Sequence, residues 1–212
     1  MSVKNIVKAG FLLSAVAAFP QAQAATFGFG CITNTSTANC DIGESQLFVD
    51  VTDAGSNQVL FTFTNTGSES SSIADVYFDD GTLLGIASID NSSSGVSFSQ
   101  DGNPGNLPGG NSVGFMTTAG FLADSDAPVQ PNGVNPSEYL GITFDLQSGV
   151  TYVDTINALQ SGTDLRIGIH VQGFGDGGSE SFVNTLVPVP AAVWLFGSGL
   201  IGLAGFARRK KV

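Results

Sequence analysis

The chain contains a single histidine, His170, and hydrolases that use a Ser-His-Asp or Cys-His arrangement need an imidazole as the proton acceptor. The segment that follows it, GFGDGGSES, supplies Asp176, Ser179 and Glu180 on a glycine-rich stretch. A hydrolytic site could be assembled from these residues. The segment contains no G-x-S-x-G elbow that would expose a nucleophilic serine. We therefore expect His170 to be an exposed strand residue and the protein not to be an enzyme.

Carboxylates are the second group of residues that could do chemistry, because hard oxygen ligands suit Ca²⁺. Asp79, Asp80 and Asp176 are the predicted ligands of an irregular Ca²⁺ site, and no other cofactor is expected. The stretch DGNPGN begins like an EF-hand loop at Asp101, but its twelfth position is Ser112 instead of a bidentate glutamate, which excludes an EF-hand. The alternative is that these Asp-Gly pairs form tight turns without metal.

Five segments that must position these residues alternate apolar and polar side chains with a period of two. QLFVDVT, for example, places Leu47, Val49 and Val51 on one face. The others are QVLFTFTN, IADVYFDD, YLGITFDL and DLRIGIHVQ. One apolar and one polar face are typical of half-buried antiparallel strands. The predicted fold class is therefore all-β, an antiparallel β-sandwich of jelly-roll or immunoglobulin-like type.

One segment has helical spacing instead. TYVDTINALQSG places Val153, Ile156 and Leu159 on one side of a helix and ends in a Ser-Gly stop signal, which predicts one short helix. The glycine and proline content predicts loops over 101–110 and 123–136.

The N-terminus has the three parts of a secretory signal peptide. Two lysines precede the apolar run 9–19, and Ala22 and Ala24 form a small-x-small cleavage pattern. The apolar run is too short to span a bilayer. We predict a signal peptide over residues 1–24 that is cut after Ala24.

The two cysteines, Cys31 and Cys40, lie shortly after this predicted cleavage site. An exported protein folds in an oxidising compartment, where a disulfide is the expected state of a cysteine pair. No histidine lies near them in the sequence, which disfavours a metal site. We predict a Cys31–Cys40 disulfide that closes the loop CITNTSTANC.

Charge is distributed unevenly along the chain. All 18 acidic residues lie between Asp41 and Glu180, where Arg166 is the only cation, so the part between the terminal signals has a formal charge of −17. Such a surface repels nucleic acid and anionic membranes. We therefore exclude nucleic acid as a partner.

The C-terminus carries an apolar run, 191–207, that just reaches the roughly 17 residues needed to span a bilayer. The basic end, with Arg208, Arg209 and Lys210, is of the kind that stays on the cytoplasmic side. This predicts a thin transmembrane helix with the rest of the protein outside the inner membrane. Two prolines before the helix favour an extended chain there.

The order Pro188-Val189-Pro190, glycine-rich helix and basic end resembles the PEP-CTERM sorting signal of Gram-negative bacteria, over residues 187–212. The resemblance implies export by the general secretory route, an intermediate anchored in the inner membrane, and processing near the Pro-x-Pro motif by the membrane enzyme exosortase. The central glutamate of the family motif is replaced by Val189. A permanent single-span anchor is the alternative to a removable signal.

The expected organisation is a signal peptide (1–24), a secreted β-sandwich domain (25–186) and a sorting signal (187–212). The resemblance implies a non-enzymatic protein of the cell surface or extracellular matrix, linked to exopolysaccharide or biofilm, with extracellular polysaccharide as a partner. The first alternative is a lectin-like carbohydrate-binding module, with Tyr77, Tyr139 and Tyr152 as candidate stacking residues. An extracellular hydrolase is the third candidate.

Overall fold

The structure is a computed structural model that describes residues 24–186. The strands are β1 (Ala24–Cys31), β2 (Leu47–Gly55), β3 (Gln58–Asn65), β4 (Ser72–Asp80), β5 (Leu83–Asp90), β6 (Phe98–Gln100), β7 (Leu122–Ser125), β8 (Tyr139–Leu146), β9 (Leu165–Gln172) and β10 (Glu180–Leu186). The helices are α1 (Thr37–Gln46), the 3-10 helix η1 (Gly110–Val113), α2 (Val129–Asn132) and α3 (Tyr152–Ser161).

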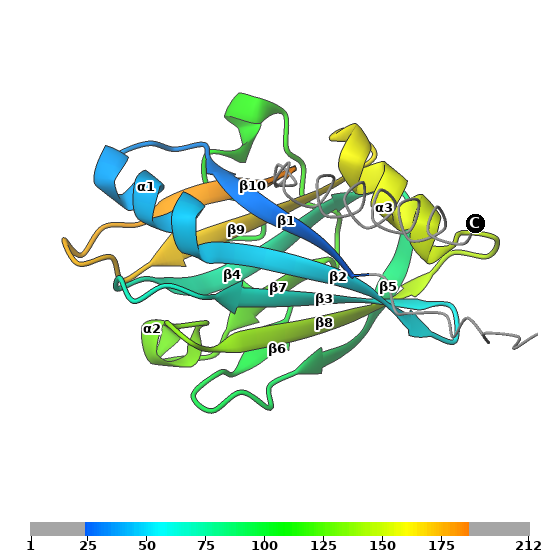
Figure 1. The fold of residues 1–212 in the computed structure, drawn as a ribbon, viewed down its shortest axis with the longest axis horizontal. Helices are drawn as coiled ribbons and strands as arrows, with labels where there is room; N and C mark the ends of the chain where they lie inside the picture. The colour runs from blue at the N-terminus through cyan, green and yellow to red at the C-terminus, as the bar shows by residue number, and fades with distance from the viewer. Residues whose placement is uncertain (1–23, 187–212) are drawn as a thin grey trace, which may run out of the picture.

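All ten strands belong to one antiparallel sheet with the order β5-β8-β3-β2-β1-β10-β9-β4-β7-β6. β1 pairs with β2 on one side and with β10 on the other, so the first strand joins the two halves of the sheet (Figure 1). The last strand, β10, lies between β1 and β9. Closure of the sheet therefore depends on both ends of the described chain.

The sheet curls back on itself until its two outer strands approach each other. The side-chain amide of Asn91, just after β5, donates to Phe98 O (3.0 Å) and accepts from Phe98 N (2.9 Å), so it pairs with β6 as a peptide group would. The prediction of an antiparallel all-β fold is confirmed. The prediction of two separate sheets needs correction, because β1 connects the halves into one nearly closed sheet.

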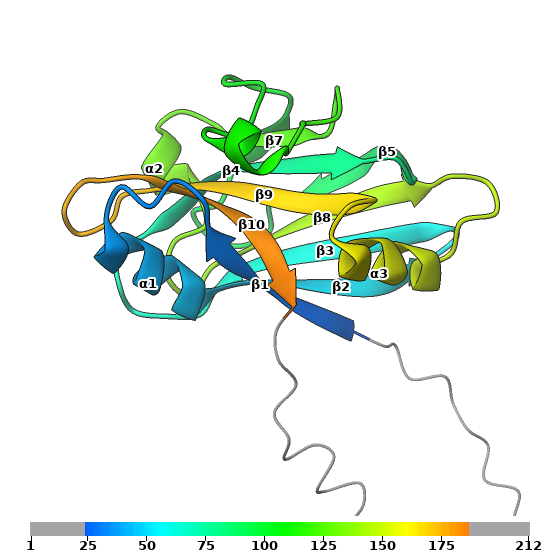
Figure 2. The ribbon, with the colours of Figure 1, turned by 90° about the horizontal axis from the view of Figure 1, so that it is seen from above.

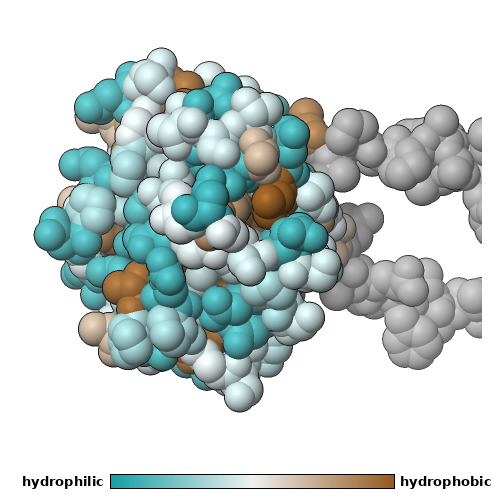
Figure 3. Space-filling model, turned by 90° about the vertical axis from the view of Figure 1, so that its left-hand side faces the viewer, coloured by the Kyte–Doolittle hydropathy of each residue, from teal (hydrophilic) through white to brown (hydrophobic). Residues whose placement is uncertain are grey.

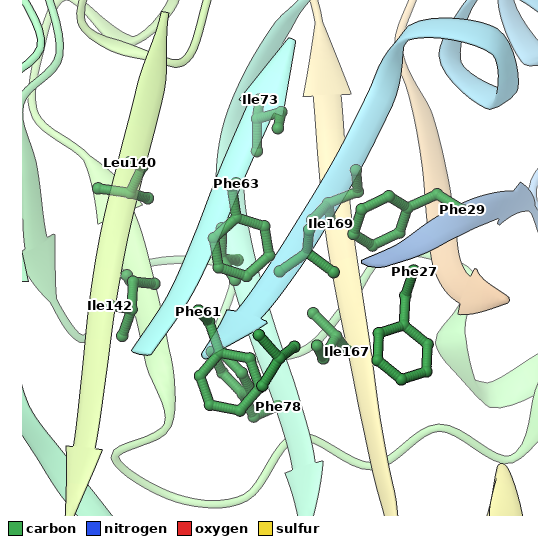
Figure 4. Close-up of a cluster of buried hydrophobic side chains, with 14 of the residues drawn as sticks. Phe27, Phe29, Phe61, Phe63, Ile73, Phe78, Leu140, Ile142, Ile167 and Ile169 are labelled. Carbon is green, nitrogen blue, oxygen red and sulfur yellow. The ribbon is translucent and has the colours of Figure 1, made fainter. Parts of the chain in front are cut away.

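The core lies between the two halves. Figure 2 shows β4 and β9 in one layer and β2 and β3 in the other. The buried side chains between them include an aromatic cluster in which the ring of Phe78 lies 4.6 Å from Phe144 and 5.1 Å from Phe61, centroid to centroid (Figure 4). Edge-to-face rings at such distances attract each other beyond simple burial.

The alternation of apolar and polar residues in the sequence determines which face of a strand packs into this core. Leu47, Val49 and Val51 are each 0% exposed, as predicted. In β4 the alternation is interrupted by a β-bulge between Ile73 and Asp75, where the register to β9 shifts. A bulge adds one residue to one strand, which is why Ile73 is followed by Val76 and Phe78 in the main core.

The predicted helix is α3, confirmed with a capping box between Thr151 and Asp154. The helix α1 is an addition that the sequence analysis missed, and it occupies part of the predicted disulfide loop. It packs closely on β10, since a Cβ on Gly43 would lie 2.2 Å from the ring of Phe182. The predicted loop 123–136 also contains most of β7 and all of α2.

The long segment between β6 and β7 covers the outer face of β4 and β9. Leu107 and Phe115 from this segment pack with Tyr77 and Leu122 into a second, smaller apolar cluster. Gly168 on β9 permits this approach, because a Cβ there would lie 2.6 Å from Leu107. Within residues 24–186, no helix has both the length and the apolar character needed to cross a membrane.

Candidate functional site

The end of β10 lies beside the start of β1. Leu186 pairs with Phe27 in the β1–β10 ladder, and Ala24 pairs with Thr52 in the β1–β2 ladder. Figure 2 shows the two strand ends at the same side of the molecule. The predicted mature N-terminus, after Ala24, therefore lies within the first two paired residues of β1. The predicted cleavage residue Ala22 and the sorting residues Pro188, Val189, Pro190, Arg208, Arg209 and Lys210 lie outside the described residues.

The last residues of β10 are held on one side only. β9 pairs with β10 up to Val183, whereas β1 continues to Leu186. The side chain of Asn184 replaces the missing backbone partner, because its Oδ1 accepts from Ile167 N at 2.7 Å. β10, the strand that leads out of the domain, is therefore hydrogen-bonded on both sides up to Asn184 and pairs only with β1 after it.

Glu180, at the start of β10, organises the loop between β1 and α1. Its buried carboxylate accepts hydrogen bonds from the hydroxyls of Thr33 and Thr35 and from the backbone N–H groups of Thr35 (3.1 Å) and Ser36 (2.7 Å). Burial alone would raise the pKa of Glu180, but these hydrogen bonds outweigh it and lower the pKa. Sequence analysis had named Glu180 only as a possible part of a hydrolytic site.

The predicted disulfide is present beside this carboxylate. Cys31 and Cys40 are joined, with their Cα atoms 5.4 Å apart. Together with Glu180 they form the only group of three potential metal ligands within ligand distance in the described part of the chain. Both sulfurs belong to the disulfide, so the group offers one carboxylate and no metal site.

Two of the three predicted Ca²⁺ ligands lie at the end of β4. Asp79 forms a salt bridge with Arg166 and accepts from Met116 N at 3.1 Å. Asp80 accepts from the backbone N–H of Leu83 at 2.6 Å, within the turn to β5. Their hydrogen bonds are those of an ion pair and a tight turn, which is the alternative that the sequence left open.

The third predicted ligand, Asp176, lies at the other end of β9. Asp80 pairs with the first residue of that strand, Leu165, whereas Asp176 follows its last residue. A backbone hydrogen bond from Gly178 and a side-chain bond from Asn39 lower the pKa of Asp176. The structure therefore does not bring the three carboxylates together.

His170 forms part of a polar row that crosses four strands on the outer face of the sheet. Asp124 on β7 is opposite Asp75 on β4, Asp75 is opposite His170 on β9, and His170 is opposite Ser181 on β10. His170 Nδ1 lies 3.0 Å from Asp75 Oδ2, and the His170 side chain is only 14% exposed. The expectation of an exposed His170 was therefore wrong, because most of its side chain is covered and its ring contacts Asp75.

This row contains the residue types of a serine hydrolase. Ser181 is 0% exposed, however, and its hydroxyl has no hydrogen-bond partner among the described residues. A nucleophile must reach the substrate carbonyl, and a fully buried hydroxyl does not. Sequence analysis could not find this row, since Asp75 and His170 are far apart in the chain.

The two carboxylates of the row influence each other. Burial, followed by the hydrogen bond and charge of Asp75, raises the pKa of Asp124 to about 6. Asp124 also accepts from Asn103 N at 3.4 Å, and Tyr77 donates from its hydroxyl to Pro104 O at 3.2 Å. The row thus holds the start of the covering segment against the sheet.

A G-x-S-x-G pattern occurs in this covering segment, at Gly110–Gly114, and sequence analysis overlooked it. Ser112 lies on the 3-10 helix η1 and donates to Gly109 O at 2.8 Å. A nucleophile elbow requires a sharp turn from a strand into a helix. The pattern at Ser112 lies on a short 3-10 helix and lacks that setting.

A polar cleft opens at the end of the sheet where α2 lies. It has a volume of about 330 Å³ and is formed by the segment before β4, by α2 with the residues after it, and by the residue that follows β9. Its lining residues are Ser70, Ser71, Ser72, Gln130, Pro131, Asn135, Pro136 and Gly173. Of the predicted stacking residues, Tyr77 is completely buried, and none of the three tyrosines lines this cleft.

Comparison with known proteins identifies one feature. Residues 186–211 match the PEP-CTERM protein-sorting motif. The match confirms the resemblance read from the sequence, and it begins at Leu186, the last residue of β10. No curated protein and no solved structure matches the chain.

Proposed function

We propose that this chain, which carries a PEP-CTERM sorting motif at residues 186–211, is an exported protein that an exosortase processes at its C-terminus. The mature protein then acts at the cell surface or in the extracellular matrix. The observation that carries the proposal is the position of the motif, which starts where the last strand ends. A folded domain is thereby followed directly by the sorting signal.

Two further features support an exported protein. The Cys31–Cys40 disulfide is the state expected in an oxidising compartment. The formal charge of −17 between the terminal segments suits a protein that stays soluble outside the cell.

We also propose that the domain acts without catalysis and in association with exopolysaccharide. The burial of Ser181 supports a non-enzymatic role, because the polar row that contains it presents no accessible nucleophile. The link to exopolysaccharide is supported by the sorting motif, as the family resemblance implies. Co-sedimentation of the protein with the polysaccharide of its own host tests this association.

Fractionation of cells with and without exosortase tests the processing. We expect the protein in the surface or extracellular fraction of the parent strain, and an unprocessed, membrane-bound chain in the strain without the enzyme. A Pro188→Ala, Pro190→Ala double variant should shift the parent strain toward the same membrane-bound form. Identical fractions and identical masses in both strains would contradict the proposal.

A further inference from the structure

The polar cleft brings together three segments that are distant in sequence. Ser70–Ser72 lead into β4, Gln130 and Pro131 belong to α2, and Gly173 follows β9. These segments lie at the left of the molecule in Figure 1. Figure 3 views this side directly and shows a predominantly hydrophilic surface.

The floor of the cleft has an unused hydrogen-bond donor. Ser71 is 3% exposed, and its Oγ accepts from Gln46 Nε2 at 2.7 Å and from Asn65 Nδ2 at 3.1 Å. A serine hydroxyl has two acceptor lone pairs and one donor hydrogen. Ser71 Oγ is the acceptor in both of these bonds, so its own hydrogen remains available to an acceptor in the cleft.

An unused acceptor belongs to Asn65, which contacts Ser71 but does not itself line the cleft. Asn65 is 1% exposed, and its Oδ1 has no hydrogen-bond partner within residues 24–186. The orientation of this amide is set by its Nδ2, whose two hydrogens are shared among Ser71 O (3.1 Å), Ser71 Oγ (3.1 Å) and Val134 O (3.4 Å). A buried polar atom without a partner is unfavourable, so this acceptor favours an ordered water or a ligand hydroxyl beside Ser71.

The walls of the cleft select the class of ligand. No lining residue carries a charge, so the cleft offers neither a cation for an anionic group nor a carboxylate for a cation. Pro131 and Pro136 present apolar ring surfaces, whereas Ser72, Gln130 and Asn135 present hydroxyl and amide groups. A sugar ring has the matching combination, with C–H faces and hydroxyls that both donate and accept. An extended peptide would instead require a free strand edge or an apolar groove.

We propose that this cleft binds a neutral sugar residue, with Ser71 and the lining amides of Gln130 and Asn135 as its hydrogen-bonding partners. This site adds a ligand class to the proposed function. It rests on that function, because it assumes that the domain lies outside the cell. It gives the domain a direct contact with a neutral polysaccharide.

Calorimetric titration of the purified exported protein with cellobiose, maltotriose, mannobiose and diacetylchitobiose tests the site, with polygalacturonate as the anionic comparator. We expect saturable binding of at least one neutral sugar. Ser70→Tyr fills the cleft from its exposed rim and should weaken this binding about tenfold or more, a loss of about 1.4 kcal/mol. Gln130→Ala, which removes one exposed rim amide, should weaken it without altering the core.

The matched control is Ser148→Tyr, an exposed serine in the turn after β8 and thus at the opposite end of that strand from Pro136. It should bind as the parent protein does. Binding of no neutral sugar, binding of polygalacturonate alone, or unchanged binding by Ser70→Tyr would overturn the proposal. A protein that binds sugar but keeps its C-terminal tail would contradict the processing proposal and leave this site intact.

Discussion

Glu180 shows how a single buried carboxylate can hold a loop without a cation as its partner. Its oxygens accept hydrogen bonds from hydroxyl and backbone N–H groups of Thr33, Thr35 and Ser36. Such charge-assisted hydrogen bonds are stronger than neutral ones. The residue thereby connects the last strand with the loop that leads from the first strand into α1.

Glu180→Gln should lower the free energy of unfolding by about 2–3 kcal/mol at pH 7, because the amide nitrogen would face hydrogen-bond donors. The lowered pKa of Glu180 means that the stabilisation is present above its ordinary pKa of 4.5 and is lost as the pH falls through the folded value. The effect of the substitution should therefore shrink in acid. Urea denaturation at pH 3 and pH 7 measures it, with the exposed Glu69→Gln as the control. An equal loss for both variants would refute this role.

Asp124→Asn should stabilise the protein, whereas Glu180→Gln should destabilise it. The pKa of Asp124 is raised from 3.8 to about 6, so the folded protein binds this proton more tightly than the unfolded chain does. Its contribution favours folding in acid and is lost as the pH rises between these two values. Removing the carboxylate should therefore stabilise the protein at pH 8, by about 1 kcal/mol since solvent screens the group, and change little at pH 4.

Thermal melts between pH 4 and pH 8 measure this difference. The titratable groups that interact with Asp124 are Asp75, Tyr77 and Asp126, and His170 contacts Asp75 in turn. Asp126→Asn is the contrasting variant, because hydrogen bonds from Ser97 and Ser99 lower the pKa of Asp126. It should destabilise the protein at neutral pH. Parallel pH profiles for Asp124→Asn and the parent protein would contradict the account.

At the scale of elements, the packing of the two sheet layers depends on aromatic rings from several strands. Phe78 on β4 contacts Phe61 and Phe63 on β3 and Phe144 on β8. The same ring therefore fixes β4 against two strands of the opposite layer.

Phe78→Leu should reduce the free energy of unfolding by about 1–3 kcal/mol, through lost volume and lost ring contacts. Urea denaturation measures the change. The control, Leu84→Ala, alters a side chain that is 64% exposed, and it should stay within about 0.5 kcal/mol of the parent protein. Equal stability of the two variants would rule out a central role for the aromatic cluster.

Period-two alternation predicted β2, β3, β4, β8 and β9, because these strands have one face in the core, as Leu47, Val49 and Val51 do. It did not predict β1, β5, β6, β7 and β10. It could not predict α1, whose buried residues are Asn39, Cys40, Gly43 and Gln46 and form no apolar stripe. Alternation could not predict the strand order either, since β1 and β10, which pair with each other, come from the two ends of the domain.

The same limit applies to the candidate sites. The disulfide and the sorting motif are local in sequence, and both were predicted. The polar row and the cleft were not, because Asp75 and His170, or Ser71 and Gln130, meet only when distant strands pair. Alternation even placed His170 on the correct, non-core face, but it carried no information about the segment that covers that face.

At the scale of the whole molecule, the two ends of the domain lie on adjacent strands. β1 starts at Ala24, the predicted end of the signal peptide, and β10 ends at Leu186, the first residue of the sorting motif. The closing strand pair is thus formed by the segments next to the two signals. We expect the sheet to close only after β10 has left the secretion channel, so that processing acts on a folded domain.

Intact-mass spectrometry of the protein from the surface or extracellular fraction tests the central proposal, export followed by removal of the C-terminal signal. The account predicts a chain that starts at Ala25, contains the oxidised Cys31–Cys40 pair, and ends before the basic residues Arg208–Lys211. Recovery of a chain that still carries Arg208 to Val212 would contradict it and would indicate a permanent anchor.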